Sequence, residues 1–301
     1  MVISLDGSEG RNVHGDIHEE EIRALFSNFF KWELIYSNFD MTFPILDTNK
    51  SKKAGIDFLY RLNEPFLEKS ENHGVIVECK GREDMENFNV SKFSEDLYKL
   101  KVKIEKANLS HDVLEDQKII DSNINYFKYG ILCYRFNSFD INKFKNVLKK
   151  CEIRDRTRKN HFPVIFILSN DRISVFSHLK KHYSNLKYYY PHYLSNQNLN
   201  LRDNLSLFYM FSDIIMFEAD GVKNILSFDE PSPTTFKLIR EVCGRFNHNI
   251  SEITFARANP FNKSIHREYN SQWVRDRGQD IKLQYLNNDM NCFEPLEEVF
   301  K

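Results

Sequence analysis

Charged side chains interrupt two apolar stretches of the sequence that are typical of buried β-strands. Asp57 lies in the stretch 55–60, and Glu78, Cys79 and Lys80 end the stretch 74–80. Side chains alternate across a strand, so Glu78 and Lys80 share one face and Cys79 points to the other. Burying a lone carboxylate or ammonium is costly unless it pairs with another charge or binds a metal. The pattern therefore predicts an ion network or a metal site where the two strands meet.

The two acids, Asp57 and Glu78, have the chemistry of ligands for a hard divalent cation. Neighbouring carboxylates repel and raise each other's pKa unless a cation lies between them, and oxygen ligands favour Mg²⁺ or Mn²⁺. A lysine such as Lys80 beside that metal stabilises a pentavalent phosphate or helps to deprotonate the attacking water. Phosphoester hydrolysis is the reaction that these residue types indicate.

An acid-x-Lys triplet alone is a weak signal, because the same chain contains it at Asp116 to Lys118 and at Asp280 to Lys282. Two features distinguish the triplet that begins at Glu78. It ends an apolar strand, and a second strand with the acid Asp57 precedes it.

The elements that must position these residues alternate between helical and strand patterns. A helix is predicted over 17–31, with Asp16 as its N-cap and Glu19 to Glu21 in its first turn. The stretch around 110–116 is predicted to be a polar loop. Strands are predicted over 55–60, 74–80, 129–136 and 162–168, and further helices over 90–107, 140–150 and 174–183. This order indicates an α/β fold with a mixed central sheet flanked by helices.

These residues and elements resemble the PD-(D/E)XK phosphodiesterase superfamily over roughly residues 16–170. The resemblance implies a restriction-endonuclease-like core. It also implies that Asp57 is the first metal-binding acid, Glu78 the second and Lys80 the catalytic lysine. The superfamily often adds an acid from the preceding helix, for which Glu19 fits best. The implied metal set is Asp57, Glu78, Cys79 and Glu19.

One position departs from the superfamily pattern, because Ile56 precedes Asp57 where proline is usual. This replacement makes the superfamily pattern harder to recognise, but it affects the chemistry of the site less, because the acid itself is present. The structural alternative is a buried ion network without a metal, but buried ion triads add little net stability compared with apolar packing. A third alternative is an intact fold that has lost its activity.

The function implied by the resemblance is a Mg²⁺- or Mn²⁺-dependent endonuclease that hydrolyses DNA, in bacterial anti-phage defence or restriction. Such nucleases often work with a second protein subunit, and a homo-oligomer is the other expectation. The competing hypothesis is a non-catalytic subunit with the nuclease fold that recognises DNA ends or a protein partner. Fold analogy alone does not choose between these roles.

The sequence predicts a nuclease-like domain over residues 1–175 and a C-terminal α/β region over 176–301 that binds DNA or a partner. In that region a strand is expected over 213–218 and a helix over 235–246. Tyr188 to Tyr190, followed by His192 and Tyr193, fit a core strand, a partner interface or a surface on which bases stack.

Local basic clusters are the candidates for contact with a phosphate backbone. His178 and His182 are four residues apart, a spacing that can bind zinc, but no third ligand follows at a familiar distance. His14 and His18 are also four apart, and His18, next to Glu19, is a candidate for contact with a phosphate. Solvated surface residues are the alternative for all of these. The basic clusters are Lys92, Lys99, Lys101 and Lys103; Arg154, Arg156, Arg158 and Lys159; and Arg275 and Arg277 beside Trp273.

Composition limits the remaining choices. The 301 residues carry a net charge of −1, so any surface for nucleic acid must be local. The apolar stretches are too short for a membrane span, and no signal peptide is evident. Five cysteines without a CxxC pair fit reduced thiols. A cytoplasmic location without membrane contact is expected.

Overall fold

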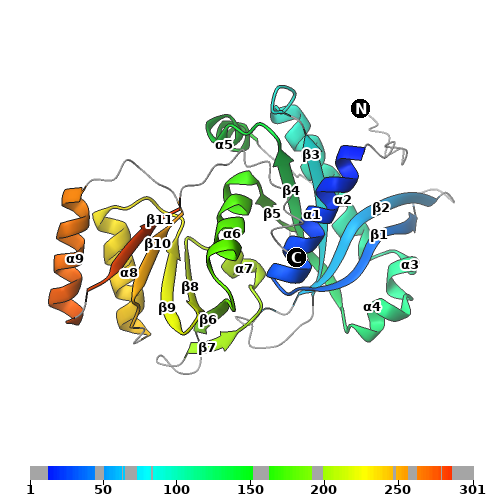
Figure 1. The fold of residues 1–301 in the computed structure, drawn as a ribbon. Coiled ribbons are helices and arrows are strands. Elements are labelled where there is room, and N and C mark those ends of the chain that lie inside the picture. The colour runs from blue at the N-terminus through cyan, green and yellow to red at the C-terminus, as the bar shows by residue number, and fades with distance from the viewer. Residues whose placement is uncertain are drawn as a thin grey trace. The chain divides into compact units, whose positions relative to one another are not determined.

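The computed structural model of the chain describes residues 13–44, 51–62, 64, 73–82, 84–151, 163–191, 199–246, 249–256, 263–278 and 280–286. The chain divides into two compact units. After the strands of the first sheet, the chain passes from the first unit at Ile173 into the second unit at Ser174. Each unit contains its own sheet and its own helices (Figure 1).

The first unit is built on a five-stranded mixed sheet, which confirms the predicted fold class. Its strands follow the order β1-β2-β3-β4-β5. The pairs β1–β2 and β2–β3 are antiparallel, whereas the pairs β3–β4 and β4–β5 are parallel. The strands are β1 (Glu33–Pro44), β2 (Ser51–Leu62), β3 (His73–Arg82), β4 (Tyr126–Phe136) and β5 (Val164–Leu168).

Helix α1 (Val13–Ala24) covers one face of this sheet and continues as a π-helical turn, η1 (Leu25–Phe29). The helix begins before Asp16, so the prediction that Asp16 is the N-cap is wrong. Its apolar side buries Ile22, Leu25 and Phe26. Near the C-terminal end of β3, Gly81 has no side chain, and a Cβ at this position would overlap the His18 imidazole of α1. The helix therefore packs closely against β3.

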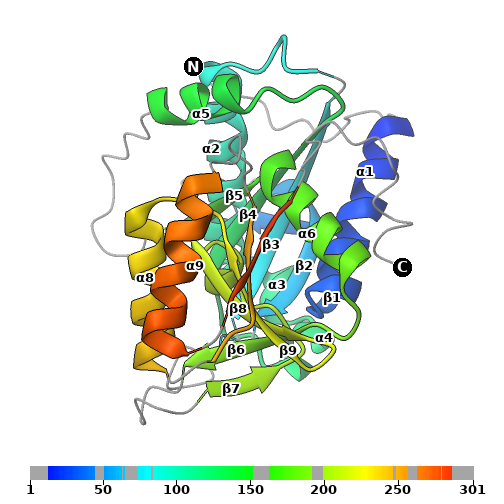
Figure 2. The same ribbon diagram turned by 60° about the vertical axis from the view of Figure 1, so that its left-hand side comes forward.

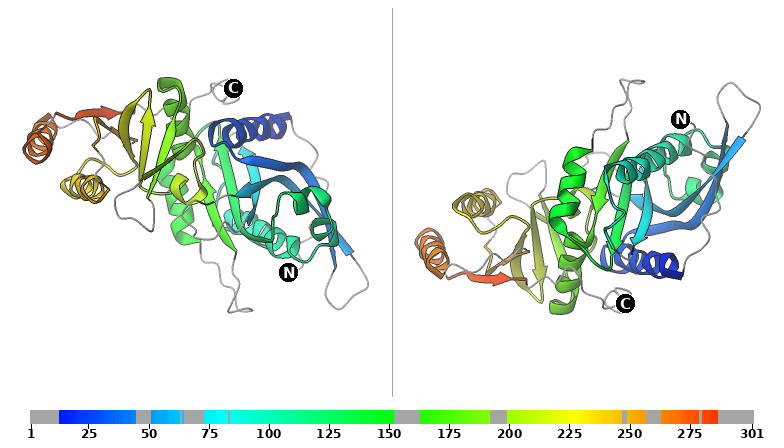
Figure 3. Two further views of the ribbon diagram at one scale, coloured as in Figure 1. Left: turned by 90° about the horizontal axis from the view of Figure 1, so that it is seen from below. Right: turned by 90° about the horizontal axis from the view of Figure 1, so that it is seen from above.

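Helix α2 (Val90–Ala107) covers the other face, and its bounds agree with the sequence prediction. Figure 3 shows α1 and α2 on opposite sides of the sheet. The Asn89 side chain accepts a hydrogen bond from the Lys92 amide at 3.0 Å and caps the helix. Leu100 and Ile104 pack onto Gly130 of β4, where a Cβ would lie 2.6 Å from Ile104 Cδ1. This glycine brings α2 close to the sheet.

Smaller elements complete the first unit. Helices α3 (His111–Leu114) and α4 (Gln117–Asp121) occupy the region that begins with the predicted polar loop, so that prediction was wrong for α3. Helix α5 (Ile141–Lys150) is capped by Asp140, whose side chain accepts from the amides of Asn142 and Lys143. An aromatic cluster of Phe88, Phe93, Tyr134, Phe136 and Phe144 fills the core beneath α2 and α5.

The second unit has a six-stranded sheet in the order β11-β10-β9-β8-β6-β7. Helices α8 (Pro233–Arg245) and α9 (Lys263–Arg277) connect the parallel strands β9, β10 and β11 and lie side by side (Figure 2). Phe236 stacks on Tyr269 between them. The strands are β6 (Lys187–Pro191), β7 (Leu199–Arg202), β8 (Ile214–Ala219), β9 (Val222–Ser227), β10 (Glu252–Phe255) and β11 (Lys282–Tyr285), and the other helices are α6 (Asn170–His182), shared with the first unit, and α7 (Leu207–Met210).

The tyrosine run forms β6 of this second sheet. Tyr188, Tyr189 and Tyr190 are all buried, so the core-strand interpretation is correct and stacking of these rings on bases is not. His192 and Tyr193 lie outside the described residues. Within the described residues, every helix is too short or too polar to cross a membrane.

Candidate active site

The candidate site lies where β2 and β3 diverge. Their antiparallel pairing runs from Leu62 opposite His73 to Phe58 opposite Val77 and ends there. Beyond this point β2 continues along β1, and β3 continues along β4. The Asp57 carboxylate takes the place of the next ladder bond, because its Oδ2 accepts the Cys79 amide at 2.7 Å. The divergence thus fixes Asp57 beside the Glu78–Lys80 triplet.

Asp57 and Glu78 interact directly through their charges. Burial, followed by the Glu78 charge, raises the pKa of Asp57 from 3.8 to about 7, while Lys80, Lys103 and the Cys79 amide lower it. Glu78 is only 3% exposed. Two carboxylates held this close at the edge of the core have an unfavourable repulsion that a cation would relieve.

Two lysines accompany the acids. The Lys103 ammonium of α2 donates to Glu78 Oε2 at 2.6 Å, and Lys80 Nζ lies 3.8 Å from the same oxygen. The other oxygen, Glu78 Oε1, is buried and accepts no hydrogen bond from the described part of the chain. In the sequence, Lys103 is recognisable only as a member of a basic cluster, because a contact from a separate helix leaves no local pattern.

Glu19 and the Cys79 side chain lie on the other face of β3. Cys79 and Gly81 alternate with Glu78 and Lys80, and Gly81 is the residue that His18 of α1 covers. The charges of Asp57 and of Glu19, which belongs to α1, both act on the Cys79 thiol. The structure therefore brings Asp57, Glu78 and Lys80 together, and Glu19 is linked to them through its charge interaction with Cys79.

The thiol of Cys79 is held neutral. Burial and the neighbouring Cys133 raise its pKa well above the ordinary value. Because a thiol ligates metals as the thiolate, this environment does not favour a metal–sulfur bond. The part of Cys79 that joins the acids is its backbone amide, through Asp57. Roles for Glu19 and Cys79 as metal ligands stay predictions.

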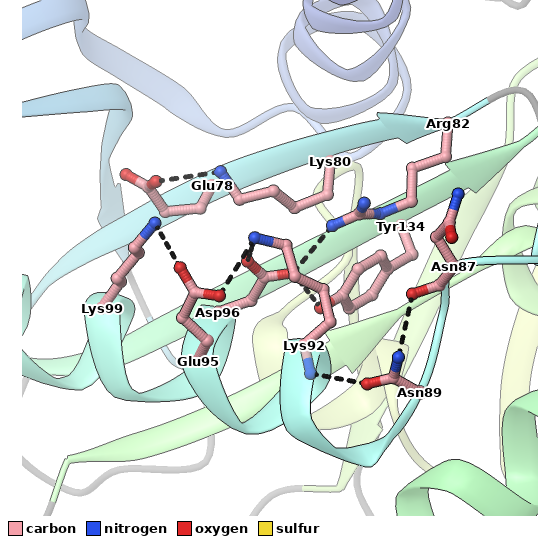
Figure 4. Close-up of polar contacts among 10 residues, drawn as sticks. All are labelled: Glu78, Lys80, Arg82, Asn87, Asn89, Lys92, Glu95, Asp96, Lys99 and Tyr134. Carbon is pink, nitrogen blue, oxygen red and sulfur yellow. Dashed lines mark hydrogen bonds and ion pairs between the residues drawn. The ribbon is translucent and has the colours of Figure 1, made fainter. Parts of the chain in front are cut away.

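A second polar cluster continues along the same face of β3, as Figure 4 shows. Asp96 of α2 is 3% exposed and accepts hydrogen bonds from Tyr134 at 2.8 Å and from Arg82 at 3.1 Å. Lys92 Nζ lies 3.9 Å away. Asp96 was not among the residues predicted for the site, although its place between the core residues Phe93 and Leu97 is a signal of burial in the sequence.

The other acid-x-Lys triplets have structural roles. Asp116 caps α4 through the Ile119 amide and accepts from the Tyr36 hydroxyl. Lys118 of the same triplet donates to the Ile35 carbonyl. In the second unit, Lys282 lies 3.3 Å from Glu252. Neither triplet ends a strand, because Asp116 caps α4 and Lys282 begins β11, and this distinguishes them from the triplet at Glu78.

The remaining sequence candidates are less organised. The His178 and His182 rings are 4.8 Å apart, and among the described residues no group of three or more His, Cys, Asp or Glu is arranged to hold a metal. His18 is buried and contacts Glu21 at 3.2 Å, so its interpretation as a surface residue is wrong. Trp273 is also buried. The structure does not describe the side chain of His14. The basic cluster of Arg154, Arg156, Arg158 and Lys159 lies outside the described residues.

The acid pair fits a hard divalent cation. Asp57 and Glu78 offer carboxylate oxygens from adjacent strands, and the buried Glu78 Oε1 still requires a partner. A cation there would satisfy that oxygen and offset the repulsion that raises the Asp57 pKa. Because two acids are fewer ligands than a closed metal site needs, water or substrate oxygens would complete the shell.

An acid on one strand of a mixed sheet and a Glu-x-Lys triplet on the next form the pattern of a PD-(D/E)XK nuclease domain. A family model described as the GAPS4 protein PD-(D/E)XK nuclease domain matches residues 8–204. The chain belongs to this family. Comparisons with curated proteins and with solved structures gave no match.

Proposed function

We propose that the chain is a metal-dependent endonuclease that hydrolyses DNA phosphodiester bonds. The observation that carries the proposal is the meeting of Asp57, Glu78 and Lys80 at the divergence of β2 and β3. The family match supports a nuclease in general. The raised pKa of Asp57 supports a cation between the two acids.

Asp57 and Glu78 are the proposed ligands of Mg²⁺ or Mn²⁺. Such a metal supplies a bound water of lowered pKa and offsets charge on the phosphate. The hydrogen bond from the Cys79 amide holds one oxygen of Asp57 in place. Burial holds Glu78 in one position, so both ligands are ordered before the metal arrives.

Lys80 is the proposed catalytic lysine. It lies on the same face of β3 as Glu78 and is about one-fifth exposed, so its ammonium is near both the acids and solvent. A cation at this place stabilises the negative charge that develops on phosphate oxygens during in-line attack. Glu19 is the proposed support for the metal shell from the α1 side.

The proposed biological role is anti-phage defence or restriction in the bacterial cytoplasm, since GAPS4 is a defence-associated family. A second subunit or a second copy of the chain is part of this proposal. The net charge of −1 supports it, because a chain without a general positive field shares DNA binding more readily with a partner.

The direct test incubates the purified full chain with linear and circular DNA in Mg²⁺, Mn²⁺ or EDTA, with RNA as a parallel substrate. We expect cleavage with the metals, none with EDTA, and a loss of at least about a hundredfold in Asp57→Asn, Glu78→Gln and Lys80→Met. The matched controls are Asp280→Asn and Lys282→Met, which alter the two exposed charged residues of an acid-x-Lys triplet in the second unit. These controls should cut DNA like the original chain.

Two outcomes would contradict the proposal. Cleavage that survives Glu78→Gln and Lys80→Met would place the chemistry elsewhere. DNA binding without cleavage under every metal, with and without the protein encoded by a neighbouring gene, would favour the non-catalytic recognition subunit instead.

A further inference from the structure

The candidate active site is already neutralised by its own side chains. Asp57 and Glu78 supply two carboxylates, and Lys80 and Lys103 supply two ammonium groups that act on them. Lys103 makes the short contact, at 2.6 Å, to Glu78 Oε2. Part of the positive charge that a metal would supply to the acids is therefore provided by the Lys103 ammonium of α2.

The position of Lys103 follows from the packing of α2. Gly130 of β4 allows Leu100 and Ile104 to approach the sheet, and Lys103 lies next to Ile104 on the helix. Its side chain is 15% exposed, and its contact with Glu78 joins residues that are distant in sequence. The fold holds this ammonium at the acid, where a freely moving surface lysine would not stay.

A divalent cation at Asp57 and Glu78 would add two positive charges to a site that is already balanced. Repulsion between that cation and a nearby ammonium is strong when both are withdrawn from water. Glu78 Oε1 gives the cation a first oxygen, but Oε2 is occupied by Lys103. The excess positive charge around the two acids would fall if the Lys103 ammonium moved away from Glu78. It would fall further if a negatively charged phosphate bound beside the cation.

We propose that Lys103 is a built-in counter-ion that competes with the divalent cation for Glu78 and turns to a DNA phosphate when the cation displaces it. This inference rests on the proposed function. It makes the binding of metal and of DNA mutually favourable, because the phosphate accepts the ammonium that the metal releases. Lys103 is then a positioning residue that restricts metal loading without DNA.

The test measures Mn²⁺ binding to the full chain without DNA, by calorimetry or by electron paramagnetic resonance at pH 8. We expect Lys103→Met to bind Mn²⁺ about ten- to a hundredfold more tightly, which is the usual value of one hydrogen bond between charged groups. Lys103→Arg retains the charge and should keep the original affinity. Lys99→Met is the matched control, since Lys99 is on the same helix but pairs with Glu95 at 2.9 Å, and its affinity should be unchanged.

A second variant and a second ligand guard against a simple folding defect. Lys103→Gln keeps a hydrogen-bond donor for Glu78 without the charge, and it should also tighten Mn²⁺ binding. A phosphorothioate duplex that resists cleavage should raise the Mn²⁺ affinity of the original chain more than that of Lys103→Met.

Unchanged or weaker Mn²⁺ binding in both Lys103→Met and Lys103→Gln would overturn the counter-ion role. If Glu78→Gln abolishes Mn²⁺ binding in that case, the proposed metal site survives and only this inference falls. If the single substitution Glu78→Gln leaves Mn²⁺ binding as tight as in the original chain, the metal site and this inference are both wrong.

Discussion

Replacing Asp57 by asparagine should make the metal-free protein more stable above pH 7 while removing metal binding. Asparagine keeps a side-chain oxygen that can accept the Cys79 amide, as Asp57 Oδ2 does at 2.7 Å. It removes the charge that burial and Glu78 disfavour. Most point substitutions are neutral or destabilising, and a gain is expected only where a protein keeps an unfavourable charge for its function.

The magnitude follows from the pKa of Asp57. A folded-state pKa of about 7 against an ordinary value of 3.8 means that the folded chain holds a proton more tightly than the unfolded chain. Stability from Asp57 is therefore fully present below pH 3.8 and is lost as pH rises through about 7. The full difference corresponds to about 4 kcal/mol. Because Asp57 is not wholly buried, solvent screening reduces it to about 2 kcal/mol.

The assay is urea unfolding in EDTA at pH 5 and pH 8.5 for the original chain and Asp57→Asn. The difference in unfolding free energy between the two proteins should change by about 1 kcal/mol between these pH values, because part of the effect is already lost at pH 5, with the variant gaining relative to the original chain as pH rises. Adding Mg²⁺ at pH 8.5 should stabilise the original chain and leave the variant unchanged. A difference that is constant with pH would refute the assignment of the raised pKa to Asp57.

Three further substitutions test the packing that positions the site. Gly130→Ala should cost about 1–3 kcal/mol in urea unfolding, because the added Cβ meets Ile104 and moves α2; equal stability would show that α2 can adjust. Asp96→Ala should cost about 2–4 kcal/mol, since it leaves Tyr134 and Arg82 without their shared acceptor, and Tyr134→Phe should cost less. Phe26→Ala should lower the free energy of unfolding by about 3–5 kcal/mol, because this fully buried ring stacks on Tyr60; a loss below 1 kcal/mol would contradict the packing of η1.

The elements with strong local patterns could be predicted from sequence. The stretch 90–107 gave the bounds of α2, and the stretches 55–60 and 74–80 lie inside β2 and β3. In each case the apolar residues repeat at the period of the element that forms. The face shared by Glu78 and Lys80 followed from strand alternation and does not depend on the rest of the fold.

Elements that depend on their neighbours were missed. Strand β1 lies at the edge of the sheet, exposes Ser37 and Asn38, and has a positive φ of 54° at Asn38. Its stability comes from pairing with β2, for which its own sequence gives little indication. The Lys103–Glu78 contact was missed for the same reason, because only the approach of α2 to Gly130 brings the two residues together.

The hydrogen bond that ends the β2–β3 ladder also provides a way to observe the site. The Cys79 amide proton is bound to the Asp57 carboxylate and not to a backbone carbonyl of β2. Its NMR resonance therefore depends on whether that carboxylate carries a proton or a cation. Since this reporter belongs to the main chain, one amide signal of the isotopically enriched chain can follow the protonation and occupancy of the site without a substitution or a substrate.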